Sequence, residues 1–335
     1  MKMKLSLFSL ALLFLISCDK EKNNNEDDHF ENGVFILNEG TWMAGNASID
    51  FFEYEEETLA ENIFSEENDR PLGDVLNAMT IYDGWGYLVV NNSQKIEVVD
   101  PENFASEATV TGLSSPRQFL GISSNKAYVS DLSSGGIYIV DLESFEVTGE
   151  IPVVGWVEEM LWVDNDVYAV DAGGANVYQI NPGTDEIVDS INVGWSPNSI
   201  REDVNGKLWI AAWGTFDGSI APTLTKINPA DNSIEQQWDM TGGLPSELEI
   251  SDAGDFIYFL NTDVVKMGVN ETTIPATPFI VADGRSLYGL GIDHNEGIIY
   301  VSAAVDVVQR GTVYRYTTDG DEIDNLLVGI VPADY

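Results

Sequence analysis

The sequence predicts an all-β protein, a seven-bladed β-propeller built from four-stranded antiparallel blades. Three observations predict it: short apolar segments alternate with Gly, Asn, Asp and Ser turns, one four-strand unit recurs at a period of about 40 residues, and the C-terminal segment matches the start of such a unit. A single four-stranded sheet cannot bury both of its faces. It therefore requires neighbours like itself, and a ring of such units is a propeller.

The repeating unit is clearest in residues 114–153. Its four apolar runs are Gln118–Ile122, Ala127–Ser130, Ile137–Asp141 and Val147–Val153. Within Ala127–Ser130 successive side chains alternate between two faces, which is the period of a half-buried strand and not of a helix. The unit is therefore a small antiparallel sheet with turns between its strands.

The second strand of the unit occurs seven times along the chain. The copies are Val34–Leu37, Tyr87–Val90, Ala127–Ser130, Val167–Val170, Leu208–Ala211, Ile257–Leu260 and Ile299–Ser302. A β-sandwich would not show seven equivalent copies, and a parallel β-helix would need a shorter period. Seven copies therefore predict seven blades.

The two ends of residues 33–335 predict how the ring closes. The chain enters at Gly33 on a second strand, so the first blade lacks its innermost strand. The C-terminal residues 328–335, VGIVPADY, match residues 193–200, VGWSPNSI, which open another unit. We expect the C-terminal tail to supply the missing strand and so remove the open sheet edges at which aggregation starts.

The N-terminal residues have the layout of a bacterial export signal. Two lysines precede a 13-residue apolar run, Leu5–Ser17, which is too short for an ordinary membrane-spanning helix. The run ends at Cys18, the only cysteine, in a sequence that is similar to the lipobox of bacterial lipoproteins. We expect residues 1–17 to be a lipoprotein signal peptide, with an ordinary signal and an incidental Cys18 as the alternative.

We expect residues 18–32 to be the lipidated cysteine and a disordered acidic tether, and residues 33–335 to form the propeller. The acyl chains on Cys18 would supply the anchors that stable membrane attachment needs. An acidic segment directly after this cysteine is similar to the surface-export signals of Bacteroidetes lipoproteins. We expect the protein to be anchored in the outer membrane and exposed at the cell surface.

Composition excludes several classes of function. The formal charge is −41, from 15 basic and 56 acidic residues, which argues against nucleic acid and against electrostatic docking on an anionic membrane. With one cysteine and two distant histidines, His29 and His294, a Cys/His metal site and a Cys–His nucleophile are excluded.

No common catalytic motif occurs in the chain. The serine hydrolase, zinc protease, P-loop and dinucleotide fingerprints are all missing. The pair Glu158–Glu159 carries little information in a chain with 56 acids, and the acidic segments Asp252–Asp255 and Asp319–Glu322 lack the full EF-hand spacing for Ca²⁺ and are expected to be turns. We therefore expect a protein that is not an enzyme and has no catalytic residue, metal or cofactor.

One face of the ring should carry the function. In a propeller, the loops before the innermost strands share a face with the loops between the second and third strands, and here these loops are the longest and most irregular: Glu39–Ala47, Ala212–Thr223 and Ala303–Gly311. Large aromatic side chains with a polar handle suit a sizeable ligand. The aromatic candidates for ligand binding are Trp42, Trp156, Trp195, Trp213, Phe216 and Tyr288.

Polar residues on the same face complete the candidate site. They are Asn91, Asn92, Arg117, Asp131, Asp171, Asn176, Asn198 and Arg285. Arginines are scarce in this chain, so Arg117 and Arg285 could meet an anionic group of a ligand. Two other interpretations remain open: the aromatics could pack between blades, and each arginine could pair with a carboxylate of a neighbouring blade.

Several segments of the chain resemble a known family. Ile36–Gly40, Pro71–Val75, Val90–Asp100, Ser115–Arg117 and Lys126–Asp131 resemble the YncE-like seven-bladed surface lipoproteins of Bacteroidetes, and the resemblance extends over residues 33–335. Some members are encoded beside TonB-dependent cobalamin transporters. The BtuG-type members bind cobalamin at the cell surface and pass it to the BtuB transporter.

The resemblance implies a cell-surface lipoprotein that captures cobalamin or another corrinoid on the loop face. Its partner would be a TonB-dependent outer-membrane receptor. Two alternatives remain: a surface propeller that binds glycans or protein, and an enzyme similar to the lactonases that hold a central Ca²⁺ with Glu, Asn and Asp.

Overall fold

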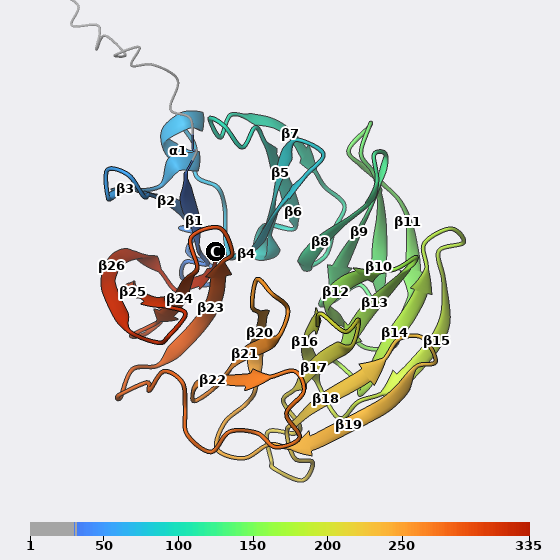
Figure 1. Cartoon of the computed structure of the whole chain (residues 1–335). Helices are drawn as coiled ribbons and strands as arrows, with labels where there is room; N and C mark the ends of the chain where they lie inside the picture. Colours follow the sequence, from blue (N-terminus) through green and yellow to red (C-terminus); the bar gives the residue numbers. More distant parts are fainter. Residues whose placement is uncertain (1–29, 31) are drawn as a thin grey trace, which may run out of the picture.

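The computed structural model describes Phe30 and residues 32–335, which form a seven-bladed β-propeller (Figure 1). The predicted signal peptide, the predicted lipidation site Cys18, His29 and all but the end of the predicted tether lie outside the described residues. Strands β4, β8, β12, β16, β20, β23 and β27 contact one another in turn and surround the axis of the ring. The predicted fold is therefore confirmed.

From the axis outward, the first three blades consist of the following strands. Blade 1 contains β27 (Pro332–Asp334), β1 (Gly33–Asn38), β2 (Ser48–Glu53) and β3 (Thr58–Ala60). Blade 2 contains β4 (Leu76–Tyr82), β5 (Trp85–Val90), β6 (Lys95–Val99) and β7 (Ser106–Val110), with a short 3-10 turn, η1 (Asn91–Ser93), after β5. Blade 3 contains β8 (Pro116–Ser123), β9 (Lys126–Asp131), β10 (Gly136–Asp141) and β11 (Glu146–Pro152).

The other four blades follow the same order. Blade 4 contains β12 (Val157–Val163), β13 (Asp166–Asp171), β14 (Asn176–Asn181) and β15 (Glu186–Asn192). Blade 5 contains β16 (Pro197–Glu202), β17 (Leu208–Ala212), β18 (Thr223–Asn228) and β19 (Ser233–Asp239). Blade 6 contains β20 (Ser246–Ile250), β21 (Phe256–Asn261) and β22 (Asp263–Gly268), and blade 7 contains β23 (Leu287–Asp293), β24 (Ile298–Ala303), β25 (Arg310–Thr317) and β26 (Glu322–Ile330).

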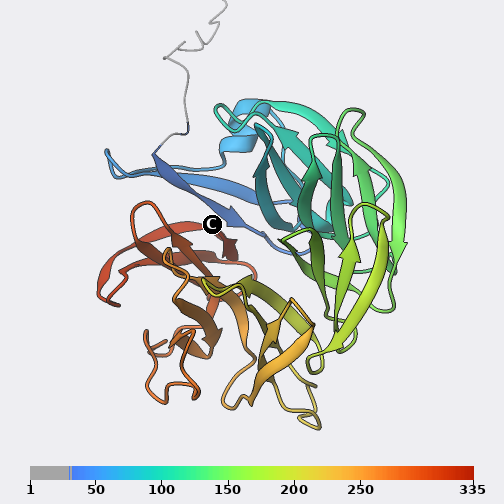
Figure 2. The ribbon, with the colours of Figure 1, turned by 45° about the vertical axis from the view of Figure 1, so that its right-hand side comes forward.

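The C-terminal tail closes the ring as predicted. Strand β27 pairs antiparallel with β1, with Asp334 opposite Leu37 and Pro332 opposite Asn38. The backbone N–H of Glu39 also donates to the carbonyl of Val331 at 2.9 Å. Figures 1 and 2 both place the C-terminus beside the first blade, so one blade is built from both ends of the described chain.

Blade 6 differs from the others at its outer edge. Its sheet has three strands, and the fourth position holds a single bridge between Val264 and Ile280. The backbone N–H of Val264 donates to the carbonyl of Ile280 at 3.0 Å. The connection to blade 7 therefore covers this edge without forming a regular strand.

The core lies between neighbouring blades. The second strand of blades 2 to 7 carries a fully buried aromatic residue at an equivalent position: Tyr87, Tyr128, Tyr168, Trp209, Tyr258 and Tyr300. These side chains pack on the next blade around the ring. The ring of Tyr87, for example, stacks on Phe119 of blade 3 with centroids 4.0 Å apart.

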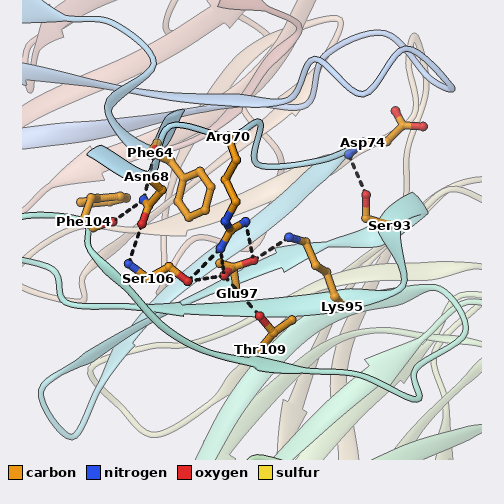
Figure 3. Close-up of polar contacts among 10 residues, drawn as sticks. All are labelled: Phe64, Asn68, Arg70, Asp74, Ser93, Lys95, Glu97, Phe104, Ser106 and Thr109. Carbon is orange, nitrogen blue, oxygen red and sulfur yellow. Dashed lines mark hydrogen bonds and ion pairs between the residues drawn. The ribbon is translucent and has the colours of Figure 1, made fainter. Parts of the chain in front are cut away.

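A buried ion cluster attaches the connection between blades 1 and 2 to blade 2, near α1 (Ile63–Asn68), the only helix of the described residues besides η1. The carboxylate of Glu97 on β6 is fully buried and accepts hydrogen bonds from Arg70 at 2.6 Å, Lys95 at 2.5 Å and Ser106 at 2.6 Å (Figure 3). Burial raises the pKa of Glu97, but these bonds outweigh it and leave the pKa below its ordinary value.

Within the described range, no helix is long and apolar enough to span a membrane.

Candidate functional site

A β-bulge near the start of each innermost strand from β4 to β23 aims polar side chains at the axis of the ring. The pairing with the second strand shifts between Leu76 and Ala78, Pro116 and Phe119, Val157 and Met160, Pro197 and Ser199, Ser246 and Glu249, and Leu287 and Leu290. A bulge adds one residue to one strand and so redirects its side chains. Asn77, Arg117, Gln118, Glu158, Glu159, Asn198, Glu247 and Tyr288 lie in these bulges and line a cavity along the axis.

This cavity, the central channel, has a volume of about 360 Å³ and receives residues from all seven blades. Its ionisable groups are six carboxylates, on Glu39, Glu158, Glu159, Glu247, Glu249 and Asp334, and two guanidinium groups, on Arg117 and Arg201. The lining is therefore strongly acidic at its formal charges.

Arg117 makes an ion pair at the loop end of the channel. Its Nε donates to Glu158 Oε1 at 2.8 Å, and its Nη2 contacts the same oxygen. The other carboxylate oxygen of Glu158 accepts a hydrogen bond from Trp156 Nε1 at 3.0 Å. The sequence left open whether Arg117 pairs with a carboxylate of a neighbouring blade. The structure shows this pair, between Arg117 of blade 3 and Glu158 of blade 4.

Arg201 makes a second set of ion pairs in the channel. Its Nη1 lies 2.8 Å from Glu159 Oε2 and its Nη2 lies 2.8 Å from Glu249 Oε1. Glu159 also accepts the backbone N–H of Ile200 at 2.9 Å. Burial still raises the pKa of Glu159, against the attraction of Arg201.

Among the described residues, the remaining carboxylates of the channel form no ion pair. Both oxygens of Glu39 accept from the Tyr288 hydroxyl, at 3.1 and 3.0 Å. Burial raises the pKa of Glu39, raises that of Asp334 to about 7, and raises that of Glu247 well above its ordinary value. The nearby carboxylates add to the shifts of Glu247 and Asp334, because like charges disfavour ionisation.

An aromatic pocket lies beside the channel on the loops of blades 4 and 5. It has a volume of about 280 Å³ and is lined by Trp156, Trp195 and Phe216 together with loop backbone. Trp195 is 41% exposed and Phe216 is 86% exposed. The pocket and the channel share a wall, because Trp156 bonds to Glu158 and because Trp213 of the channel directly precedes Gly214 of the pocket.

The structure thus brings six of the predicted ligand-binding residues to these two cavities. Arg117, Trp213 and Tyr288 line the channel, and Trp156, Trp195 and Phe216 line the pocket. Asn198, on the same predicted rim, also lines the channel. Trp42 is exposed on the loop of blade 1 and borders neither cavity.

Asp131 and Asp171 are placed differently from the prediction, which had them facing a ligand. Both are buried, at 0% and 1% exposure. Asp131 accepts backbone N–H groups from Ser115 and Ser133, at 2.6 and 2.7 Å, and so ties two loops of blade 3 together. Each aspartate satisfies loop groups, because an aspartate at the end of a second strand faces the loop N–H groups on both sides.

Gly155 fits closely over Asp171. The glycine has a φ of +107°, and a Cβ at that position would lie 2.3 Å from Asp171 Oδ1. Asp171 also accepts the Tyr178 hydroxyl at 3.0 Å. It therefore supports the loop that carries Trp156.

Asn91, Asn92 and Arg285 also lie outside both cavities. Asn91 is buried, and its amide donates to the carbonyl of Pro116 in blade 3 at 2.8 Å. The Asn92 amide donates to Asp74 Oδ2 at 2.5 Å. Arg285 donates to the Tyr316 hydroxyl at 3.0 Å and lies over the Tyr314 ring, so it attaches the connection from blade 6 to blade 7.

Sequence reasoning missed most of the channel. The missed residues are Glu39, Asn77, Glu158, Glu159, Arg201, Glu247, Glu249 and Asp334. Their common signal is position, since most lie one to four residues after the start of an innermost strand. In the described part of the chain, no group of three or more His, Cys, Asp or Glu side chains is arranged to hold a metal ion.

Comparisons of structure show the fold. A quinonprotein alcohol dehydrogenase-like protein of Bacteroides thetaiotaomicron aligns with a TM-score of 0.72 at 15% identity, over 91% of this chain and 78% of that one. A protein from Lactobacillus plantarum aligns with a TM-score of 0.67 at 12% identity, over 90% of this chain and 97% of that one. The dihydro-heme d1 dehydrogenase NirN aligns with a TM-score of 0.62 at 11% identity, over 91% of this chain and 75% of that one.

Comparisons of sequence identify the family. No curated protein matches this chain in sequence. A family model described as "Domain of unknown function (DUF5074)" matches residues 32–324, which is nearly the whole propeller. The chain therefore belongs to the DUF5074 family.

Proposed function

We propose that this propeller is a non-enzymatic binding protein that captures a sizeable amphiphilic ligand on its loop face. The observation that carries the proposal is the aromatic pocket beside the polar mouth of the channel. Trp195 and Phe216 leave apolar faces open to solvent, although exposed aromatic clusters are uncommon on soluble proteins unless they bind something. Glu158 at the channel mouth accepts the indole N–H of Trp156 in the pocket wall and pairs with Arg117, so hydrogen-bonding groups adjoin the pocket.

A corrinoid is the ligand that we propose. It combines flat apolar surface with a rim of amide groups, so it needs aromatic faces and hydrogen-bonding side chains next to each other. The pocket and channel mouth offer this combination across one shared wall. The resemblance to cobalamin-binding surface lipoproteins, carried by segments such as Ile36–Gly40, is a second support.

Delivery and anchoring complete the proposal. The lipobox-like segment ending in Cys18 would hold the propeller at the outer membrane, and the captured ligand would pass to a TonB-dependent receptor. Metabolic labelling with a palmitate analogue tests the anchor. Label should enter the wild-type protein and be lost in C18S. Label retained in C18S would contradict lipidation at this residue.

Calorimetric titration of the purified protein with cyanocobalamin tests the ligand. We expect a dissociation constant in the micromolar range or tighter, and a weakening of about tenfold or more for Trp195→Ala and for Phe216→Ala, as for buried aromatic contacts at binding sites. Trp162→Ala is the matched control, because Trp162 is also partly exposed but borders a different cavity. Absence of micromolar binding would remove the corrinoid and leave the binding face to other ligands.

A glycan is the second candidate for the same pocket. Sugar rings stack on indole faces, and the Asp217 and Thr215 side chains at the pocket edge could bond their hydroxyls. Glycan-array binding that is lost in Trp195→Ala, without corrinoid binding, would favour it.

A further inference from the structure

The central channel holds more negative charge than its own arginines neutralise. Six carboxylates line it against two guanidinium groups. Arg117 forms an ion pair with Glu158, and Arg201 forms ion pairs with Glu159 and Glu249. Glu39, Glu247 and Asp334 therefore form no ion pair within the described residues.

Glu247 is the group that most needs a partner. Among the described residues its carboxylate forms no hydrogen bond or ion pair, and the partly exposed Glu247 lines the channel. The bulge holds its backbone at a φ of +50°, in the left-handed region that a residue with a side chain rarely adopts. The fold thus places an unpartnered carboxylate in the channel at a conformational cost.

The charged neighbours of Glu247 further disfavour an ionised carboxylate without a cation. Asp334, Glu159 and Glu249 act on it as like charges, and Arg201 is the only cation among the groups that act most strongly on it. Burial raises the pKa of Asp334 to about 7, so this carboxyl group is partly protonated at neutral pH when no cation is bound.

The walls of the channel favour an organic cation. Its volume of about 360 Å³ is in the range of small-molecule sites, and its lining includes the indole of Trp213 and the phenol of Tyr288, aromatic groups of the kind that attract a positive charge. Asn77, Thr80 and Asn198 provide neutral polar groups around it. We propose that the central channel binds a small organic cation with ammonium or guanidinium groups, held by Glu247, Asp334 and Glu39.

The cation proposal does not rest on the corrinoid proposal, because Glu247 and Asp334 are not among the groups assigned to the corrinoid, although Tyr288 at the channel mouth serves both sites. The two can therefore fail separately. If cobalamin does not bind but the cation does, only the channel function stands.

Calorimetric titration of the purified protein with putrescine and with agmatine tests the channel. The titrations are made at pH 7 with 150 mM NaCl in an amine-free buffer, so that diffuse attraction to the acidic surface is screened. We expect saturable binding with about one site per chain and an affinity that increases from pH 6 to pH 8, as the carboxylates lose their protons. The neutral analogue 1,4-butanediol should not bind.

Two charge-matched variants locate the site. Glu247→Gln should weaken putrescine binding about tenfold or more, whereas Glu186→Gln, on the exposed start of β15, should leave it unchanged. Circular dichroism and the melting temperature show that each variant is folded. Absence of saturable amine binding, equal affinity in Glu247→Gln, or binding of Ca²⁺ in place of the amines would each overturn the proposal.

Discussion

Arg117 and Glu158 pair across the boundary between blades 3 and 4, with Arg117 Nε 2.8 Å from Glu158 Oε1. The same carboxylate holds the indole of Trp156 through its other oxygen. One side chain thus connects the acidic channel to the aromatic pocket. A substitution in the Arg117–Glu158 pair should therefore alter the position of Trp156 in the pocket.

The first prediction concerns this connection. Glu158→Gln removes the charge that Arg117 pairs with and weakens the bond to Trp156. We expect a loss of about 1–3 kcal/mol in the free energy of unfolding, because a partly buried guanidinium loses its partner. Urea denaturation measures this loss, and a shift in tryptophan emission reports the freed indole. An unchanged emission spectrum and an unchanged urea midpoint would show that the Arg117–Glu158 pair does not hold Trp156 in place. Glu186→Gln is the control.

The second prediction concerns the buried ion cluster around Glu97 in blade 2. Glu97→Gln leaves Arg70 and Lys95 without their shared carboxylate, and we expect a cost of about 2–4 kcal/mol, reduced from that of a fully buried pair because Arg70 is 41% exposed. Urea denaturation at pH 7 measures it. A loss below about 0.5 kcal/mol, typical of a surface residue, would contradict the structural role.

The pH dependence of the same cluster has a defined sign. The fold lowers the pKa of Glu97 below its ordinary value of 4.5, so its stabilisation is fully present above that value. It is lost as the pH falls through the lower pKa of the folded state. The difference in stability between wild type and Glu97→Gln should therefore shrink in acid, and a constant difference down to the acid transition would contradict this assignment.

The third prediction concerns Glu247, whose contribution to stability changes with pH in the opposite direction to that of Glu97. The fold raises the pKa of Glu247 well above 4.5, so its contribution to stability is present at low pH and declines as the pH rises from 4.5 through the folded pKa. Glu247→Gln does not titrate and should be more stable than wild type at pH 8, by on the order of 1 kcal/mol, with little difference at pH 4. Thermal unfolding in amine-free buffer at the two pH values measures this. A variant less stable than wild type at pH 8 would show that the carboxylate has a partner.

The fourth prediction concerns ring closure. Deletion of Pro332–Tyr335 removes β27 and exposes the inner edge of β1. We expect a loss of about 3 kcal/mol or more, from lost pairing and from the lost stack of Tyr335 on Tyr300, together with aggregation through the open edge. Differential scanning calorimetry and light scattering measure the two effects. Ser302→Ala, which removes one bond to the Pro332 carbonyl, should have a smaller effect, and equal effects would contradict a role of the whole strand.

The fold was predictable from sequence because its signal is local and repeated. The buried aromatic of the second strand, from Tyr87 to Tyr300, recurs with alternating apolar neighbours, and the match of residues 328–335 to another blade start predicted the closure. The site was less predictable, because it depends on which polar residue a bulge aims inward. Glu158–Glu159 looked uninformative among 56 acids, yet both residues line the channel. In contrast, Asp131 looked like a rim residue although its carboxylate is used by the loop backbone.

The bulges of the innermost strands have a consequence for how such proteins diversify. Each supplies a channel residue from outside the regular ladder, as Asn77, Asn198 and Tyr288 illustrate. A substitution there alters the chemistry of the axis without changing a paired residue of the sheet. Six blades therefore offer six separately editable bulges around one cavity, so new specificities can be selected or designed one blade at a time on an unchanged scaffold.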